Sequence, residues 1–496
     1  MIPKSKIQCT MLHNQFPFFK NNSNIYLDSA ASCQKPQTVI DAITDFYSSE
    51  YSSNHGVHNL ANNLNEKIES CRELIARFIN AKSSKEIVFT SGATESFNLI
   101  AQSIKVPKNK TNILICIAEH HSNLLPWQIL ATENNLEIRY FRLTKTGEID
   151  LGDFESKIDS DTFLVAASHC SNVLGIINDV QTICEIGSKY GAISVVDATQ
   201  SIVHTDVDVQ GINCDFLAFS GHKIYGPTGI GVLYGKSEQL EKLNNYKVGG
   251  EMVELVTREK NYYKETPYRF EAGTINLAGI IGLKAAIEWF ISNKQEIFDT
   301  EKELYKYCLE KLLVVENIEM LGYPLSKGSE AKTQGDSKNH RHPELISVSP
   351  TTEDSYGVKT TPTATLSPLH EGYSTNTNVI MNEPKIEIGM SSQREVAASL
   401  TEGVNPTQRL PTENKLQPKQ ATIFSFTIQG INSYDLAEYL NLKNISIRVG
   451  QHCTGLLHEH LELDSTLRIS LACYNTREDI DKFVEEIKNG IRILKF

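Results

Sequence analysis

Short apolar runs recur along the first half of the chain, and each is followed by small or polar residues. The runs lie at 87–89, 112–118, 163–167, 192–196 and 216–219. Stretches with helical periodicity separate some of them, such as 66–79, where apolar side chains recur on one face. Buried strands that alternate with helices are typical of a parallel sheet with helices on both faces. The pattern therefore predicts an α/β fold for this part of the chain.

The end of the chain has a different pattern, which indicates a second, smaller domain. Helical periodicity is found at 280–291, 301–313 and 434–440, and strands are expected at 421–427, 445–449 and 467–471. We expect an N-terminal segment at 1–20 that packs with the small domain, a large domain at 21–285, and a small α+β domain at 286–326 and 421–496.

Residues 327–420 have the composition of a disordered insertion. This segment contains no Phe or Trp and only two Tyr, yet eight of the sixteen prolines of the chain. Such a segment buries too little apolar surface to offset the entropy lost on ordering. It is expected to be an inert extension, since loops tolerate length at little cost, or a tether for a partner.

The composition narrows the classes of function. With 496 residues, the chain is long enough for two or more domains. Its 60 acidic and 48 basic residues give a formal charge of -12, which argues against nucleic acid or an anionic membrane as the main partner.

The ten cysteines include no Cys-x-x-Cys pair, and His55 and His58 lack a third ligand nearby, so no metal site is predicted. Without a secretory signal or an apolar run of membrane-spanning length, we expect a cytoplasmic protein.

Lys223 is the most informative single residue. It lies in Ser220-Gly221-His222-Lys223, directly after the apolar run 216–219. Ligands of open α/β sheets bind at the carboxyl ends of strands. A desolvated lysine there can form a Schiff base with pyridoxal phosphate. The alternative is a solvated loop lysine.

Three other candidates follow predicted strands of the large domain. Gly92-Ala93-Thr94 begins a helix and can bind a phosphate, although Thr94 can also be an ordinary N-cap. His120 can stack on a planar cofactor and exchange protons, or be an ordinary histidine. Asp197 can pair with a protonated pyridine nitrogen, or cap a helix.

The small domain supplies two further candidates. Cys453 lies between Gly450 and Gly455 and beside His452, and it can be a nucleophilic thiolate or a buried, inert cysteine. Arg468 lies in the strand 467–471, and its planar guanidinium is suited to bind a carboxylate through two donors.

Together these motifs resemble the cysteine desulfurases of the class V aminotransferase family, specifically the SufS-like branch with its related selenocysteine lyases. The resemblance covers about 16–323 and 421–496. The matching motifs are Glu119-His120-His121-Ser122-Asn123, Ser171-Asn172-Val173-Leu174-Gly175, Val196-Asp197-Ala198-Thr199-Gln200, 220–231, Gly249-Gly250-Glu251-Met252, 269–274 and Cys473-Tyr474-Asn475-Thr476.

The resemblance implies fold type I of the pyridoxal phosphate-dependent transferases, with a mainly parallel seven-stranded sheet. Lys223 would carry the cofactor, and His120 would stack on its ring. Asp197 would pair with the pyridine nitrogen, and Gln200 would bond the phenolic oxygen. The residues implied to hold the phosphate are Ala93, Thr94, Ser220, His222 and, from the second subunit of a homodimer, Thr274.

The resemblance also implies how the substrate is handled. Arg468, helped by Asn172, would bind the substrate carboxylate, and Arg448 would orient the cysteine loop. Cys453 would take the sulfur of L-cysteine as a persulfide and release L-alanine. The sulfur would pass to an acceptor protein of the SufE or SufU type for iron-sulfur cluster assembly, and the insertion would be a candidate tether for it.

The sequence departs from the family pattern at three places. Asn54-His55 precedes Gly56, where the family usually has His-Arg, and Ile275 replaces a proline. In the cysteine loop, Gln451 replaces a histidine, and Thr454-Gly455-Leu456 replaces Ala-x-Pro. These departures leave the loop geometry and the choice of acceptor open.

Two alternative functions accompany the desulfurase interpretation. A selenocysteine lyase needs the same cofactor and can dispense with the thiol of Cys453. A cofactor-binding scaffold that acts through the insertion would bind pyridoxal phosphate with negligible turnover. The scaffold is disfavoured because Lys223, Cys453 and Arg468 are all present.

Overall fold

The computed structural model describes residues 12–54, 56–322 and 420–495. All of them belong to one compact unit. Of the predicted insertion, only Gln420 is described, and the prediction of disorder for 327–419 lies outside the described residues, as does His55.

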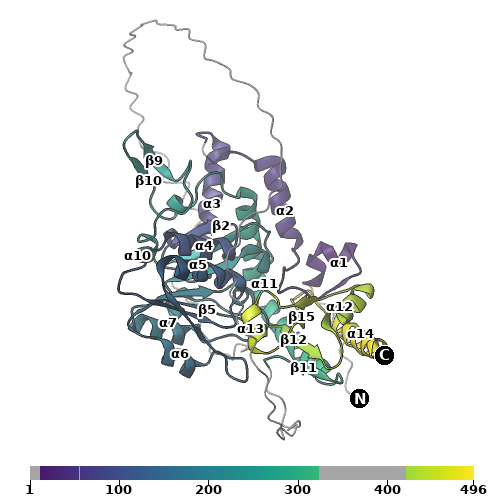
Figure 1. Cartoon of the computed structure of the whole chain (residues 1–496). Coiled ribbons are helices and arrows are strands. Elements are labelled where there is room, and N and C mark those ends of the chain that lie inside the picture. The colour runs from purple at the N-terminus through teal and green to yellow at the C-terminus, as the bar shows by residue number, and fades with distance from the viewer. Residues whose placement is uncertain (1–11, 55, 323–419, 496) are drawn as a thin grey trace, which may run out of the picture. The chain divides into compact units, whose positions relative to one another are not determined.

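The large sheet has seven strands, which extend through the middle of the molecule (Figure 1). In spatial order they are β2 (Ile87–Thr90), β8 (Gly231–Gly235), β7 (Phe216–Ser220), β6 (Ile193–Asp197), β5 (Thr162–Ser168), β3 (Asn112–Cys116) and β4 (Glu137–Phe141). β8 alone runs in the direction opposite to the other six strands. The predicted α/β fold with a mainly parallel seven-stranded sheet is confirmed.

Helices cover both faces of this sheet and bury its apolar side chains. Along β5, Val165 and Ala167 join one core cluster, whereas Leu164 and Ala166 join the other. This alternation explains why a strand buried on both faces appears in the sequence as a continuous apolar run. The first cluster is completed by α3 (Asn59–Phe78), α6 (Leu151–Lys157), α7 (Val180–Lys189) and α11 (Leu277–Leu312), and the second by α4 (Ala93–Ser103) and α5 (Leu125–Asn134).

A smaller antiparallel sheet holds the C-terminal part of the chain. Its strands, in spatial order, are β11 (Ile318–Met320), β12 (Ile423–Ile428), β15 (Thr466–Ser470) and β14 (Arg448–Gly450). The helices α12 (Ser433–Leu442) and α14 (Arg477–Leu494) pack on it around a third apolar cluster. Residues from before and after the predicted insertion thus pair in one sheet, through β11 and β12.

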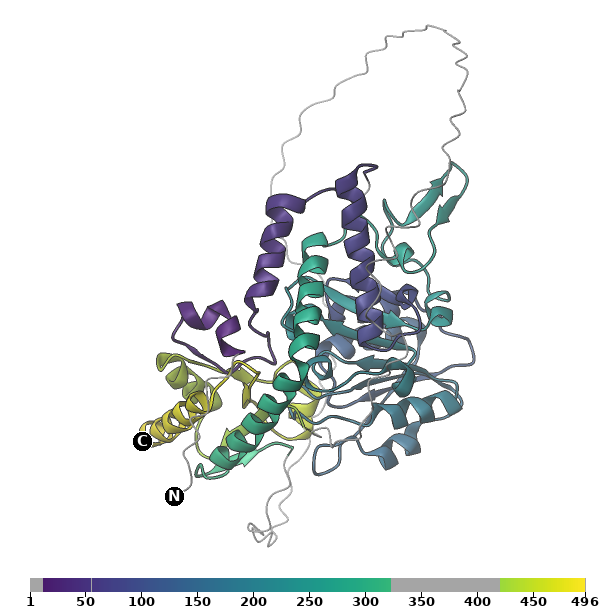
Figure 2. The ribbon, with the colours of Figure 1, turned by 180° about the vertical axis from the view of Figure 1, so that it is seen from behind.

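Helix α11 is one continuous helix, although the sequence pattern predicted two helical stretches. It crosses the predicted domain boundary at 285/286 and runs from the large sheet to the small one (Figure 2). The buried stripe continues from Phe290 through Ile297 to Leu304. Since no proline interrupts it, the helix continues through Ser292-Asn293, which the periodicity had left as a gap.

The remaining elements connect these layers. They are the helices α1 (Pro17–Asn21), α2 (Gln37–Asp45), α8 (Ser201–His204), α9 (Val209–Ile212), α10 (Ser237–Leu240) and α13 (Gly455–His460), the strands β1 (Ile25–Tyr26), β9 (Val253–Val256), β10 (Asn261–Tyr263) and β13 (Ile445–Ser446), and the short helical turns η1 (His13–Gln15), η2 (Phe46–Glu50), η3 (Ser84–Glu86), η4 (His121–Asn123), η5 (Gly221–Lys223) and η6 (Tyr268–Phe270). Near the N-terminus, the ring of Phe16 packs against Tyr225, Trp289 and Tyr474.

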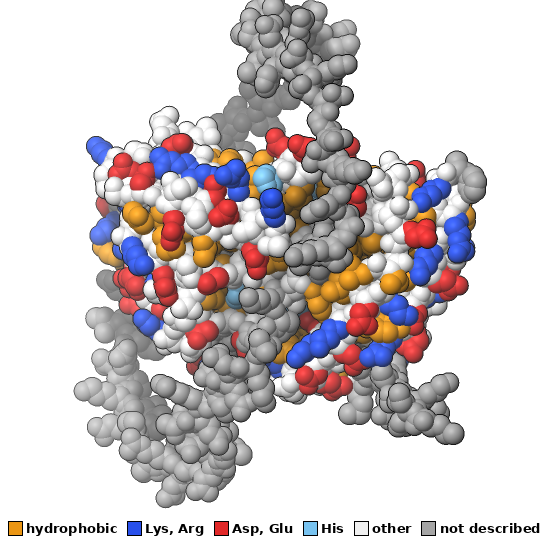
Figure 3. Space-filling view, turned by 90° about the horizontal axis from the view of Figure 1, so that it is seen from below, with side chains coloured by type: hydrophobic (Ala, Val, Ile, Leu, Met, Phe, Trp, Pro, Cys, Tyr) orange, Lys and Arg blue, Asp and Glu red, His pale blue; other side chains and the backbone are white. Residues whose placement is uncertain are grey.

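Charged side chains are mixed on the surface. On the face in Figure 3, acidic and basic side chains lie interspersed with small hydrophobic groups. Among the helices described, none has the length and apolar character needed to cross a membrane.

Candidate active site

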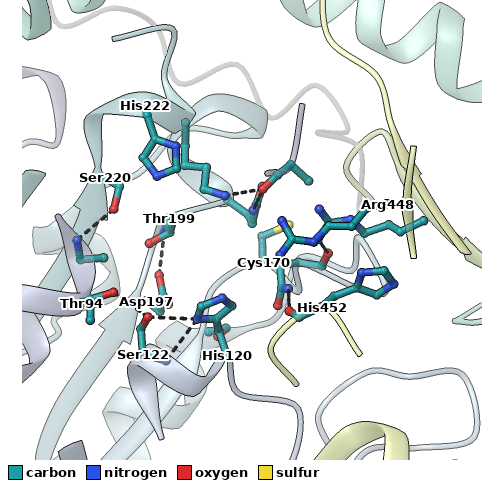
Figure 4. A pocket seen from close by; sticks show the side chains of 17 residues that line it. Thr94, His120, Ser122, Cys170, Asp197, Thr199, Ser220, His222, Arg448 and His452 are labelled. Atoms are coloured by element: carbon teal, nitrogen blue, oxygen red, sulfur yellow. Dashed lines mark hydrogen bonds between the residues drawn. The ribbon is translucent and has the colours of Figure 1, made fainter. Parts of the chain in front are cut away.

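One cavity collects side chains from the carboxyl ends of the parallel strands and from the small sheet. Figure 4 shows Thr94, Asp197 and Ser220 on one side of it and Arg448 and His452 on the other. The predicted residues that line it are Ala93, Thr94, His120, Asn172, Asp197, Gln200, Ser220, His222, Lys223, Arg448 and Arg468. Cys453 and Thr274 do not line it: Cys453 is half-buried on the adjacent loop, and Thr274 is exposed before α11.

Six lining residues received no role from the sequence: Ala30, Ser122, Ser168, Cys170, Thr199 and His452. Four of them lie within or beside motifs that the sequence analysis singled out for other members. Their position after a strand was therefore a usable signal, although it did not specify which side chains face the cavity.

Lys223 lies directly after β7, in η5, and its amine is held by the segment that follows β1. Its Nζ donates to the carbonyl oxygen of Ala30 and, over 2.8 Å, to that of Ala31. Burial, assisted by the positive charge of Arg468, lowers the pKa of Lys223 to about 8. The amine is therefore neutral, and nucleophilic, over a much larger part of the physiological pH range than a solvated lysine.

The start of α4 forms a polar pocket opposite the lysine. The backbone N–H of Ala93 donates to Ser220 Oγ over 2.9 Å, and the hydroxyls of Thr94 and Ser122 are 2.7 Å apart. The first N–H groups of a helix carry partial positive charge and lack acceptors within the helix. Together with these hydroxyls, the N-terminus of α4 suits an anionic group such as a phosphate.

His120 and Asp197 also line the cavity. The Nδ1 of His120 accepts from the backbone N–H of Ser122 over 3.1 Å, so the ring orientation is fixed. Burial and the nearby Lys223 lower the pKa of His120 to about 4, so the ring is neutral at pH 7. Burial raises the pKa of Asp197, whose Oδ1 accepts from the N–H of Thr199 over 2.8 Å. A buried carboxyl of this kind favours a cationic partner.

Arg468 enters the cavity from β15 and is 2% exposed. One terminal nitrogen, Nη1, donates to the carbonyl oxygen of Asn172 over 2.9 Å. The other, Nη2, donates to Asp28 Oδ1 over 3.1 Å. Within the described residues its Nε has no partner. These two bonds orient the guanidinium, and the N–H at Nε remains available to donate to a ligand.

The loop that carries Cys453 has a strained backbone that is supported from both sheets. His452 and Cys453 both have positive φ, at 51° and 60°. The side-chain amide of Asn172 donates to the carbonyl oxygen of His452 over 2.9 Å. The ring Nε2 of His452 lies 2.9 Å from Thr466 Oγ1, and burial lowers the pKa of His452 to about 2. Asn172 therefore connects the cysteine loop to Arg468.

Glu119 is a buried carboxyl that received no role from the sequence, although it belongs to the motif that contains His120. It accepts from Ser168 N over 2.7 Å, from Ser168 Oγ over 2.6 Å and from Asn123 Nδ2 over 2.6 Å. Burial raises its pKa to about 7. These bonds join the end of β5 to the loop after β3, and so they hold two walls of the cavity together.

The sequence matches a known family model and known enzymes over most of its length. The family model described as aminotransferase class-V matches residues 25–335 and 372–483. The unmatched interval between these segments lies within the predicted insertion. The chain is 34% identical to a cysteine desulfurase of Pectobacterium carotovorum, with 97% of each chain covered. It is 35% identical to a probable cysteine desulfurase of Halalkalibacterium halodurans, with 94% of this chain and 92% of that one covered.

Solved structures of cysteine desulfurases also superimpose on nearly the whole chain. A crystal structure of a cysteine desulfurase from Escherichia coli superimposes with a TM-score of 0.73 at 27% identity, covering 98% of this chain and 99% of that one. The apo structure of a cysteine desulfurase from Thermococcus onnurineus NA1 superimposes with a TM-score of 0.75 at 29% identity, covering 97% and 98%.

Proposed function

The chain belongs to the class-V aminotransferase family, and from that membership we propose how its cavity works as the active site of a pyridoxal phosphate-dependent cysteine desulfurase. The overall reaction converts L-cysteine to L-alanine and passes the sulfur to an acceptor. The observation that carries the proposal is the convergence of Lys223, Asp197, the start of α4 and Arg468 on one cavity.

The cavity has the chemical groups that pyridoxal phosphate requires. Lys223 offers an amine with a lowered pKa, and Asp197 offers a buried carboxylate for the pyridine nitrogen. Thr199 also lines the cavity, and its hydroxyl and backbone N–H both act on the carboxyl of Asp197. Ala93, Thr94, Ser220 and His222 would hold the phosphate, His120 the ring and Gln200 the phenolic oxygen.

When bound, the cofactor supplies an electron-withdrawing ring that activates the bonds to the α-carbon of the substrate. The residues of the chain do the rest. Lys223 Nζ takes and returns the proton at the substrate carbon, since its pKa lies near neutral pH. Arg468, whose orientation is fixed by Asn172 and Asp28, holds the substrate carboxylate.

Cys453 is the proposed sulfur acceptor within the enzyme. Its Sγ attacks the substrate sulfur, and an S–S bond forms as the carbon–sulfur bond breaks. The electron pair stays on the carbon, which is then protonated and leaves in alanine. The thiol lies near enough to Arg468 for the two side chains to interact electrostatically. Arg448, opposite Arg468 in the strand pairing, is proposed to orient this loop.

Several finer features are proposed with the mechanism. The active unit is a homodimer in which the exposed Thr274 reaches the phosphate of the other subunit. The sulfur passes to an acceptor of the SufE or SufU type for iron-sulfur cluster assembly in the cytoplasm. The preferred substrate is L-cysteine rather than selenocysteine.

The persulfide on Cys453 gives the most direct test. The chain loaded with pyridoxal phosphate is incubated with L-cysteine and analysed by mass spectrometry. We expect the peptide that contains Cys453 to gain the mass of one sulfur atom, and reductant to remove it. Release of alanine without this mass, or with the sulfur on another cysteine, would refute the role proposed for Cys453.

A further inference from the structure

The Cys453 loop has a support for which the mechanism gives no role, namely His121. The backbone N–H of His121 donates to the carbonyl oxygen of Cys453 over 2.8 Å. Its ring nitrogen Nε2 accepts from the backbone N–H of Gly455 over 3.1 Å. His121 therefore holds the loop on both sides of Thr454, from a segment that belongs to the large sheet.

The loop depends on such support because of its own conformation. Left-handed backbone at residues other than glycine costs about 1 kcal/mol or more for each residue, and it persists only when the surroundings impose it. Cys453 and His452 both have this conformation. Thr454, the N-cap of α13, donates its hydroxyl to the carbonyl oxygen of Gln451 over 2.7 Å and makes no side-chain cap. The ring of His121 instead accepts from the first N–H of α13.

The same short segment forms part of the proposed cofactor site. His120, which precedes His121, has its ring fixed by Ser122. The hydroxyl of Ser122 contacts that of Thr94, in the first turn of α4. Three consecutive residues thus contact the ring position, the phosphate end and the thiol loop. A rearrangement of side chains in the cofactor site can therefore change the position of the thiol, because one peptide segment contacts both.

We propose that His121 is a positioning residue that couples occupancy of the cofactor site to the position of the Cys453 thiol. This inference rests on the proposed function for the identity of the cofactor. Because Nε2 must accept from Gly455, the proton of the neutral ring lies on Nδ1. When the cofactor contacts His120 and Ser122, it adds to the hydrogen bonds that already fix this segment, so His121 holds the loop more firmly and the thiol becomes less accessible to reagents in solution.

Two substitutions separate the ring acceptor from a general structural role. In His121→Gln, the amide oxygen can occupy the position of Nε2 and accept from Gly455. In His121→Asn, the shorter side chain places its oxygen near the position of Nδ1, so this bond is lost. Both variants keep the backbone N–H to Cys453. His460→Asn, at the exposed end of α13, is the matched control.

The readout is the rate at which iodoacetamide alkylates Cys453, followed by peptide mass spectrometry with and without pyridoxal phosphate. Hydrogen exchange of the segment 451–457 is measured on the same samples. In the wild-type chain and in His121→Gln, we expect the cofactor to slow alkylation several-fold. In His121→Asn this slowing disappears and exchange increases. In the same variant, His121→Asn, kcat for alanine release falls about tenfold because one hydrogen bond is lost, whereas KM stays within twofold of the wild-type value.

Several results would overturn the proposal. One is an alkylation rate that does not respond to the cofactor in the wild-type chain, which needs no substitution to observe. A second is that His121→Asn shows the wild-type alkylation and exchange. A third is that His121→Gln loses the slowing by the cofactor, as His121→Asn is expected to do. If the wild-type chain releases no alanine from L-cysteine, the proposed function fails, whereas alkylation and exchange still decide the coupling.

Discussion

Arg468 donates to the carboxylate of Asp28 over 3.1 Å, although the same guanidinium is the proposed ligand of the substrate carboxylate. Asp28 lies in the segment after β1, whose carbonyl oxygens at Ala30 and Ala31 also hold Lys223. One segment therefore orients both the amine and the guanidinium. The two groups proposed to act on one small substrate are therefore fixed relative to each other before it binds.

Substitution of Arg468 by lysine tests the carboxylate site. Lysine keeps the charge but loses the planar two-donor edge, so we expect KM for L-cysteine to rise by about tenfold to a hundredfold, in line with charge-assisted bonds of about 1.5–3 kcal/mol. Steady-state alanine release measures it. Arg492→Lys, in the last turn of α14, is the control. An unchanged KM in Arg468→Lys would place the carboxylate elsewhere.

The lowered pKa of Lys223 predicts the pH dependence of cofactor loading. Burial favours the neutral amine, so the rate of reaction of the cofactor-free chain with pyridoxal phosphate should rise with pH and level off above about 8. An amine with the ordinary lysine pKa would continue to gain rate up to about pH 10. Rapid-mixing absorbance measurements from pH 6 to 10 distinguish the two, and a rate that still rises at pH 10 contradicts the prediction.

Asp28→Asn should move this pH profile in a defined direction. The negative charge of Asp28 favours the ammonium form of Lys223 and so raises its pKa. Its removal should therefore shift the midpoint of the loading rate to lower pH. The same absorbance measurement applies. A midpoint that moves to higher pH, or does not move, would show that Asp28 does not act on the amine through its charge.

Cys453→Ala separates desulfurase from lyase chemistry. We expect alanine release from L-cysteine to fall more than about a hundredfold, as for loss of a nucleophile, while release from L-selenocysteine persists. The absorbance of bound cofactor should not change, because Cys453 does not line the cavity. Equal activity of the variant and the wild type on L-cysteine would favour a selenocysteine lyase.

The ion pair between Arg72 and Glu271 should be important for stability. Their side chains are 1% and 4% exposed, and Arg72 Nη1 lies 2.7 Å from Glu271 Oε1. Glu271 also accepts from the N–H of Phe89 over 2.8 Å. Glu271→Gln removes the buried counter-charge of Arg72 and leaves only the partly exposed Glu69, whose Oε2 lies 3.3 Å from Arg72 Nε, so we expect a loss of about 3 kcal/mol in the free energy of unfolding.

Urea unfolding of the cofactor-loaded chain measures this loss. Glu265→Gln is the matched control, since Glu265 pairs with Lys85 on the exposed surface, where such pairs contribute at most about 1 kcal/mol. Similar unfolding midpoints for the two variants would contradict the importance of the buried pair.

Deletion of 327–420 tests the tether hypothesis. Alanine release from L-cysteine should remain near the wild-type rate, because the strands on either side pair directly in the small sheet. Association with a sulfur acceptor should weaken in a pull-down that compares the two chains. Unchanged association would favour an inert extension.

The positions of the proposed catalytic side chains were predictable because, in this fold, the polar residues that follow parallel strands meet in one cavity. Lys223, His120 and Asp197 each follow an apolar run, and the ends of parallel strands meet at one edge of a sheet. Residues separated by about a hundred positions could therefore be placed in one cavity from the sequence. The continuity of α11 was not predicted because the mostly polar stretch 292–300 interrupts the apolar periodicity.

The supporting contacts were not predictable in the same way. Asp28 with Arg468, and His121 with Gly455, join segments more than three hundred residues apart. Nothing in the local pattern of an aspartate or a histidine specifies a partner at that distance. Such contacts depend on how the small sheet packs against the large one, which only the tertiary structure defines.

Helix α11 rigidly connects the large sheet to the small sheet. At 1.5 Å per residue, its 36 residues form a rod about 54 Å long. Its first turn follows the loop of Thr274, and its last turns carry Leu304 and Leu312 into the core of the small sheet that holds the cysteine loop. A rotation of the small sheet must bend this rod or swing its far end. In the proposed dimer, where the loop of Thr274 reaches the other subunit, a swing of that end would displace the phosphate contact proposed for Thr274.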